Sequence, residues 1–161
     1  MLSHEDFVKL VDKECLEVLE FLKTVDRSLH GNELRNKMID MLSFMARFGE
    51  LMDKMSFRRG RQEKYMDLVE SLAVQGINSD PVLSKVPVTL RKSYIENFSI
   101  SINLSGEIKQ TTLYDEKMKF ERYQYAYSRY RNINELLKTS IMVCQSCLSF
   151  DRTEMKNMNY S

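Results

Sequence analysis

Two cysteines near the end of the chain have a spacing that serves both zinc binding and disulfide exchange. Cys144 and Cys147 are separated by two residues, as in many redox and zinc motifs. A redox pair needs the positively polarised start of a helix, whereas this pair lies near the carboxyl end of a predicted helix. A zinc site needs four ligands, and the other candidates are only Cys15, His4 and His30. We therefore interpret the pair as small apolar core residues and expect neither a metal nor a cofactor.

The two histidines are the side chains best suited to acid–base chemistry near neutral pH. His4 falls in the first turn of a predicted helix, and His30 falls at the predicted end of that helix. Capping or solvent exposure explains both positions, and neither has the preceding Glu-x-x that di-iron bundles require. The common glycine-rich phosphate motifs, Gly-x-Ser-x-Gly and His-Glu-x-x-His are absent. We therefore expect a protein that is not an enzyme, with an enzyme lacking any known motif as a third alternative.

Two groups of basic residues could contact the phosphates of a nucleic acid. Arg58, Arg59 and Arg61 lie just before an expected helix start, where free amides and the helix dipole also favour a phosphate. On the last predicted helix, basic, aromatic and amide side chains repeat at spacings of three and four, which suits phosphate contact with base stacking. These residues are Lys119, Arg122, Tyr125, Arg129 and Asn132. Acidic residues share that helix, and a solvated charged face needs no ligand.

Two apolar surfaces could contact another protein. The second predicted helix carries a methionine-rich stripe, which could repack against several partners if it were exposed. Its heptad-like spacing favours the other interpretation, a seam buried within one chain or a homo-oligomer. A predicted hairpin offers a strand edge that invites pairing with another chain. The candidate interface residues are Met41, Met45, Met52, Ile100, Ile102 and Leu104.

The composition is typical of one folded domain. The chain has 161 residues, of which 43% are apolar and 29% charged. Its 24 basic and 23 acidic side chains create no long-range field that would attract nucleic acid or an anionic membrane. No apolar run approaches the roughly 18 to 20 residues needed to span a bilayer, and the amino terminus does not resemble a secretory signal. Three cysteines, an odd number, indicate reduced thiols, and we expect a cytoplasmic protein that is neither secreted nor membrane-bound.

The spacing of apolar residues predicts long helices that would position these groups. Ser3 can cap a first helix whose stripe runs to Val25, and Gly31 can end it in a left-handed conformation. The stripe of a second helix runs without a fault from Leu34 to Met55. The segment 57–61 then interrupts the pattern.

Shorter elements follow this interruption. A third helix over residues 65–73 can be closed by Gly76, Asp80 can cap a turn, and Pro87 precedes a short helix near residues 88–97. Thr112 and Asp115 can cap a last helix that reaches about residue 150.

Apolar and polar residues alternate over residues 98–104, which predicts the first strand of a β-hairpin. A two-residue loop would place Leu104 opposite Glu107, whereas a three-residue loop would place it opposite Ile108. We favour the three-residue loop because it gathers the apolar side chains on one face.

We predict a mainly α fold, a bundle of long amphipathic helices with a β-hairpin inserted at about residues 98–114. Residues 1–150 would form a single domain, and residues 151–161 a flexible polar tail. The leading function is a non-enzymatic scaffold, adaptor or subunit of a larger assembly, which binds a protein partner or a second copy of the chain. The alternative is binding of RNA or single-stranded DNA, which a steep dependence on salt would distinguish.

Overall fold

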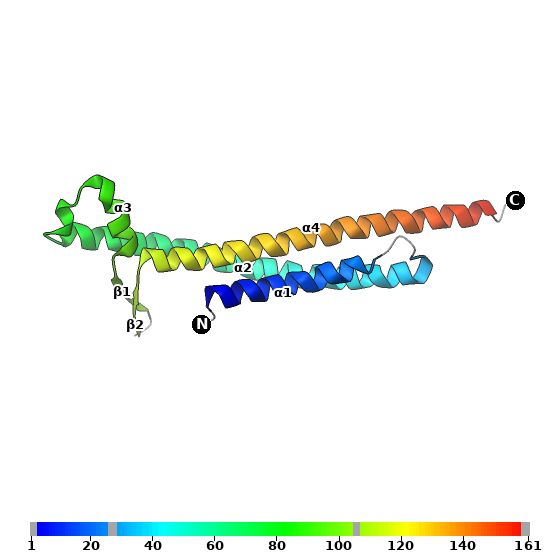
Figure 1. The fold of residues 1–161 in the computed structure, drawn as a ribbon, viewed down its shortest axis with the longest axis horizontal. Coiled ribbons are helices and arrows are strands. Elements are labelled where there is room, and N and C mark those ends of the chain that lie inside the picture. Colours follow the sequence, from blue (N-terminus) through cyan, green and yellow to red (C-terminus); the bar gives the residue numbers. More distant parts are fainter. Residues whose placement is uncertain (1–2, 26–28, 105–106, 159–161) are drawn as a thin grey trace. The chain divides into compact units, whose positions relative to one another are not determined.

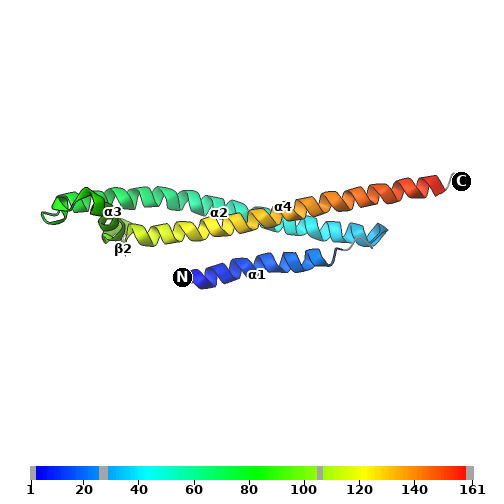
Figure 2. The same cartoon turned by 45° about the horizontal axis from the view of Figure 1, so that its top comes forward.

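The protein is mainly α-helical with one inserted two-stranded antiparallel hairpin, which confirms the predicted fold class (Figures 1 and 2). The structure is a computed structural model that describes residues 3–25, 29–104 and 107–158, without the side chains at 104, 151 and 154–158. Its elements are α1 (His4–Lys23), α2 (Gly31–Ser79), the 3₁₀ helix η1 (Leu83–Lys85), α3 (Val88–Asn97), β1 (Ile100–Leu104), β2 (Glu107–Thr111) and α4 (Leu113–Met158). Among these residues, no helix is both long enough and apolar enough to cross a membrane.

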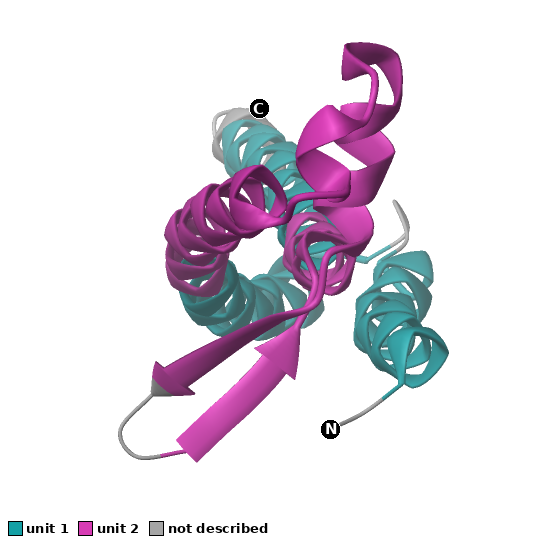
Figure 3. Cartoon of the chain, turned by 90° about the vertical axis from the view of Figure 1, so that its left-hand side faces the viewer, with its two compact units in different colours: residues 1–55, 125–161 teal, residues 56–124 magenta. Residues whose placement is uncertain are grey.

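The chain divides into two compact units (Figure 3). Unit 1 comprises residues 1–55 and 125–161, and unit 2 comprises residues 56–124. Unit 1 therefore contains α1, the first part of α2 and most of α4, whereas unit 2 contains the rest of α2, α3, the hairpin and the start of α4. The sequence pattern did not indicate this division.

Helix α1 begins at its predicted cap. The Ser3 hydroxyl accepts a hydrogen bond from the backbone amide of Asp6 at 3.1 Å and donates one to the Asp6 carboxylate at 2.7 Å. The helix ends at Lys23, earlier than the periodicity predicted. Gly31 does have a positive φ of 55°, but it begins α2 and does not end α1.

Helix α2 is continuous over 49 residues, so the predicted interruption at residues 57–61 is wrong. Its buried stripe keeps a seven-residue spacing over most of the helix; the buried apolar members are Leu34, Met41, Phe48, Met55 and Val69. The stretch looked like a break because Arg59 and Gln62 fall on the stripe. Both side chains are accommodated there, since Arg59 donates to Gln124 at 3.0 Å and Gln62 donates to the Glu116 carboxylate at 2.7 Å.

Gly76 does not close a helix, because α2 continues to Ser79. The ring of Phe98 lies against it, and a Cβ atom at this position would come within 2.7 Å of the Phe98 Cζ atom. Gly76 therefore serves close packing inside unit 2. The Asp80 carboxylate accepts hydrogen bonds from the amides of Val82 and Leu83, which confirms the predicted cap of the following turn.

The hairpin pairs in the register of the two-residue loop, which is not the one we favoured. Ile100 lies opposite Thr111, Ile102 opposite Lys109, and Leu104 opposite Glu107. Ile108 is left 74% exposed on the other face. This register prevails because Ile100 and Ile102 alone supply the apolar contacts, while the opposite residues on β2 reach a buried carboxylate described below.

Helix α4 begins at its predicted capping box. The Thr112 hydroxyl accepts from the Asp115 amide at 3.1 Å, and the Asp115 carboxylate accepts from the Thr112 amide at 3.3 Å. The helix continues to Met158, beyond the predicted end near residue 150. Part of the predicted polar tail is therefore helical, and residues 159–161 lie outside the described residues.

Each unit has its own core. In unit 1, the Phe48 and Tyr130 rings lie 5.5 Å apart and nearly perpendicular, and they join α2 to α4. The other fully buried residues of unit 1 include Val11, Cys15, Val18, Ile133 and Leu137. In unit 2, a cluster joins α2, β1 and the first residue of α4; it consists of Val69, Ala73, Ile100, Ile102 and Leu113.

Candidate functional site

A buried carboxylate lies at the centre of unit 2. Glu116, near the start of α4, is 1% exposed. Its oxygens accept hydrogen bonds from the Thr111 hydroxyl at 2.6 Å, the Lys119 ammonium at 2.6 Å and the Gln62 amide at 2.7 Å. The Lys109 ammonium lies 3.4 Å away. These contacts tie α2 and β2 to α4 around one charge, an arrangement that the sequence analysis did not anticipate.

The Glu116 carboxylate stays ionised far below neutral pH. Burial has the largest single influence and would raise its pKa, but the hydrogen bonds from Lys119, Thr111 and Gln62 together outweigh burial and lower the pKa to about 2. A general base needs a pKa near the operating pH. Glu116 is therefore suited to anchoring the hairpin and not to moving protons.

A second polar network fixes α1 in unit 1. The Asp12 carboxylate accepts from the Tyr125 hydroxyl at 2.7 Å and from the Arg129 guanidinium at 3.1 Å. The Glu14 carboxylate accepts from the Tyr130 hydroxyl at 2.6 Å. Burial and then this hydrogen bond raise the pKa of Tyr130. The predicted nucleic-acid stripe on α4 is thus partly occupied by acidic groups of α1.

The structure places the other candidate nucleic-acid residues inside helices. Arg58, Arg59 and Arg61 lie in the middle of α2, where no free helix amides are available to a phosphate. Lys119 bonds to Glu116, and Arg122 is half-buried. Arg58 and Arg61 are exposed, and the Arg61 guanidinium lies 5.8 Å from the ring centre of Phe57.

The predicted protein-interface residues are mostly packed within the chain. Met41, Ile100 and Ile102 belong to the cores of the two units, because apolar residues of other elements cover them. Met45 and Met52 are half-buried. Leu104 ends β1, and its side chain lies outside the described part of the structure.

The cysteines that suggested metal or redox chemistry differ in how deeply they are buried. Cys15 and Cys144 are buried, whereas Cys147 is exposed. Burial raises the pKa of the Cys15 thiol to about 11 and also raises that of Cys144. In the described parts of the chain, no three His, Cys, Asp or Glu residues come together as metal ligands.

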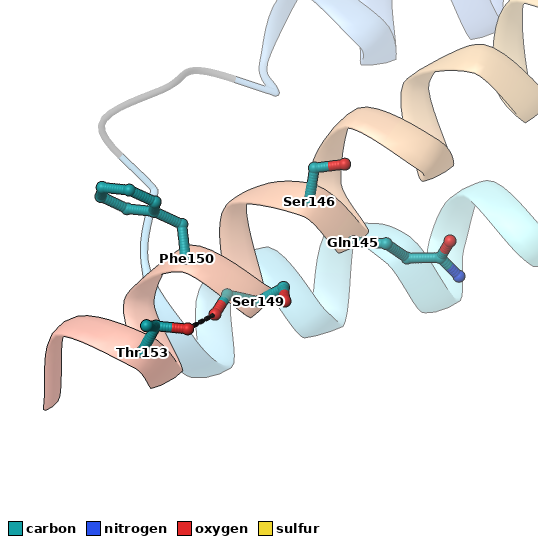
Figure 4. Close-up of a pocket in the computed structure, with 5 residues that line it drawn as sticks. All are labelled: Gln145, Ser146, Ser149, Phe150 and Thr153. Carbon is teal, nitrogen blue, oxygen red and sulfur yellow. Dashed lines mark hydrogen bonds between the residues drawn. The ribbon is translucent and has the colours of Figure 1, made fainter. Parts of the chain in front are cut away.

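A shallow depression lies along α4 (Figure 4). Its lining residues are Gln145, Ser146, Ser149, Phe150 and Thr153. All five come from one helix, and none of these side-chain types is titratable. The Thr153 hydroxyl donates to the Ser149 carbonyl at 3.0 Å. The depression therefore offers hydroxyl, amide and aromatic groups for contact, and its lining residues include no acid–base group.

Exposed apolar side chains occur on every long helix. On α4 they include Leu136, Val143 and Phe150, which repeat every seven residues, and Met142 beside them. The other large exposed apolar residues of the described chain are Leu10, Leu16, Ile39, Leu42, Phe57, Leu68, Val82, Val88, Leu90, Tyr94, Ile108 and, at the start of α4, Tyr114. Single exposed apolar residues are normal, but a row at heptad spacing is typical of a helix-packing face.

No family model matches the chain, and neither a curated protein nor a solved structure matches it.

Proposed function

We propose that this protein is a non-enzymatic assembly component, a scaffold or a subunit of a larger complex, that binds protein through its helical surfaces. The observation that carries the proposal is the row of exposed apolar residues on α4, Leu136, Val143 and Phe150. A helix that packs only within its own chain needs one apolar stripe, and this part of α4 has a buried stripe and an exposed one.

The displaced pKa values also support a non-catalytic role. Among the described residues, each resolved displacement moves a pKa away from neutral pH: upward for two cysteines and three tyrosines, and downward for three carboxyl groups. Catalytic acids and bases are usually shifted towards the operating pH. These groups instead fix elements to one another, as Glu116 fixes the hairpin.

To test this proposal, the protein is cross-linked at its native concentration in the cells that produce it and is then purified. The measurement is the polypeptide composition of the cross-linked product. We expect a complex of fixed stoichiometry, either with a second copy or with another polypeptide, that persists at high salt. A monomeric chain with no stoichiometric partner at either low or high salt contradicts the proposal.

Nucleic-acid binding is the second candidate, and the surroundings of Phe57 favour it. This ring is 67% exposed on α2, the Arg61 guanidinium lies 5.8 Å from its centre, and Arg58 is the next residue in the sequence. An aromatic ring flanked by guanidinium groups can stack a base and contact phosphates. Binding of a labelled single-stranded oligonucleotide should weaken steeply with salt and should be lost in Arg61→Glu but kept in the control Arg35→Glu. Absence of binding at low salt contradicts this candidate.

A further inference from the structure

One segment of α4 differs in charge from the rest of the chain. Residues 139–150, TSIMVCQSCLSF, contain no charged side chain, although 29% of the protein is charged. Ile141 and Cys144 face the core of unit 1. The opposite side, which carries Met142, Val143 and Phe150, is exposed. A solvated helix face normally carries charges, so this side has the composition of a covered surface.

The exposed side has the spacing of a helix-packing seam. Val143 is 54% exposed and Phe150 64% exposed, and Leu136 precedes Val143 by a further seven residues. Seven-residue spacing keeps side chains on one line along a pair of supercoiled helices. Small side chains lie between the large ones, and Figure 4 shows Phe150 at the edge of the depression that contains Ser146 and Ser149. A knob and a hole therefore lie side by side on one face.

Three hydroxyl groups in this part of α4 can be buried without loss of their hydrogen bonds. The Thr139 hydroxyl donates to the Glu135 carbonyl at 2.9 Å, and the Ser146 hydroxyl donates to the Met142 carbonyl at 3.0 Å. Thr153 donates to Ser149 in the same way. Since these donors are satisfied within the helix, covering them with apolar atoms leaves them paired.

The end of α4 also lacks support from the other helices of unit 1. In both views the last turns of α4 extend past the start of α2 and the end of α1 (Figures 1 and 2). A short helical segment without tertiary contacts is only marginally stable in water. A partner on this face would supply the contacts that unit 1 does not.

We propose that the α4 face formed by Leu136, Val143, Cys147 and Phe150 binds the same face of a second copy of this chain. The inference rests on the proposed assembly function and names the partner. A second copy fits because the face is neutral: two copies bring no like charges together across a two-fold axis, whereas a charged partner would bury unpaired charges against apolar side chains.

The experiment compares the native chain with two variants by light scattering and sedimentation. We expect the native protein at twice its monomer mass of 19.0 kDa. Val143→Glu should halve that mass, because it places a carboxylate from each copy in an apolar seam. The matched control, Val88→Glu, alters an exposed valine on α3 and should leave the dimer intact. Unchanged circular dichroism in both variants shows that the fold is retained.

Cys147 supplies an independent proximity test. It is exposed, whereas Cys15 and Cys144 are buried. A bismaleimide with a spacer of about 8–10 Å, close to one interhelix distance, should join two native chains but not two Cys147→Ser chains. A native mass of 19.0 kDa at all concentrations overturns the inference. A dimer that withstands Val143→Glu also overturns it, but that outcome leaves the assembly function standing, as does a monomer that carries a stoichiometric partner of another sequence.

Discussion

The buried carboxylate of unit 2 should govern the stability of that unit. We consider Glu116→Gln, which preserves the size of the side chain but removes its charge. The oxygen of the replacement amide can still accept from the donors on one side, but its NH₂ group then faces either the Gln62 amide or the Thr111 and Lys119 donors. At least one donor is therefore left facing another donor in a site that is 1% exposed.

The magnitude follows from the lowered pKa of Glu116. The difference between an ordinary 4.5 and about 2 corresponds to roughly 3 kcal/mol, at about 1.36 kcal/mol for each tenfold change. The side chains of Lys109 and Lys119 remain 45% and 19% exposed, so water screens part of the interaction. We therefore expect Glu116→Gln to lower the free energy of unfolding of unit 2 by about 2–3 kcal/mol at pH 7.

The effect of this substitution should depend on pH in one direction. Because the pKa of Glu116 is lower in the folded protein, the unfolded chain takes up the proton first as the pH falls. The stabilisation is complete above about pH 4.5 and is lost progressively as the pH approaches 2. The difference in stability between the native protein and Glu116→Gln should shrink by about 1–2 kcal/mol between pH 7 and pH 3.

Urea denaturation followed by circular dichroism, with hydrogen exchange of the β2 amides as a local probe, measures this difference. Glu70→Gln is the control, since Glu70 is an exposed glutamate of the same unit, and it should change stability by less than about 0.5 kcal/mol. Equal losses for the two variants, or a Glu116→Gln loss that is the same at pH 7 and pH 3, would contradict a stabilising role for the Glu116 charge.

Three further outcomes follow from packing and burial. Gly76→Ala should destabilise unit 2 by about 1–3 kcal/mol in thermal unfolding, because the added Cβ would collide with Phe98. In the control Gly60→Ala the added Cβ has no atom within 4 Å, and the substitution should stabilise α2 by about 0.5–1 kcal/mol. Tyr130→Phe should cost about 1–2 kcal/mol in urea denaturation, since it removes a 2.6 Å bond to an α1 carboxylate. Cys15, whose pKa burial raises to about 11, should react with a maleimide only in the unfolded protein, as peptide mapping by mass spectrometry would show.

Local signals in the sequence were sufficient to predict much of the fold. Ser3 and the pair formed by Thr112 and Asp115 cap the helices that they were expected to cap. The stripe from Leu34 to Met55 lies towards the core, as its spacing predicted. These features succeed because each depends on residues within one or two turns of each other.

Features that depend on distant residues could not be predicted in the same way. Arg59 and Gln62 interrupt an apolar stripe when α2 is considered alone, and only their partners on α4 show that the helix continues. The hairpin register has a similar origin. Apolar matching favours Ile108 inside, but Thr111 and Lys109 instead turn towards Glu116, because a buried carboxylate without partners would cost more than an exposed isoleucine.

The functional interpretation of charged residues is limited in the same way, because their partners can lie far away in the sequence. A stripe of Lys119, Tyr125 and Arg129 resembles a phosphate-binding face only while the carboxylates that pair with it are unknown. Asp12 lies more than a hundred residues away in the chain from the groups it binds, and no spacing rule connects them. An exposed apolar surface indicates a binding site more directly than a charged one. A charged side chain can already be paired within the chain, whereas an exposed valine or phenylalanine is not covered by any other part of it. For this protein the neutral face of α4, more than its arginines, therefore indicates where a partner should be sought.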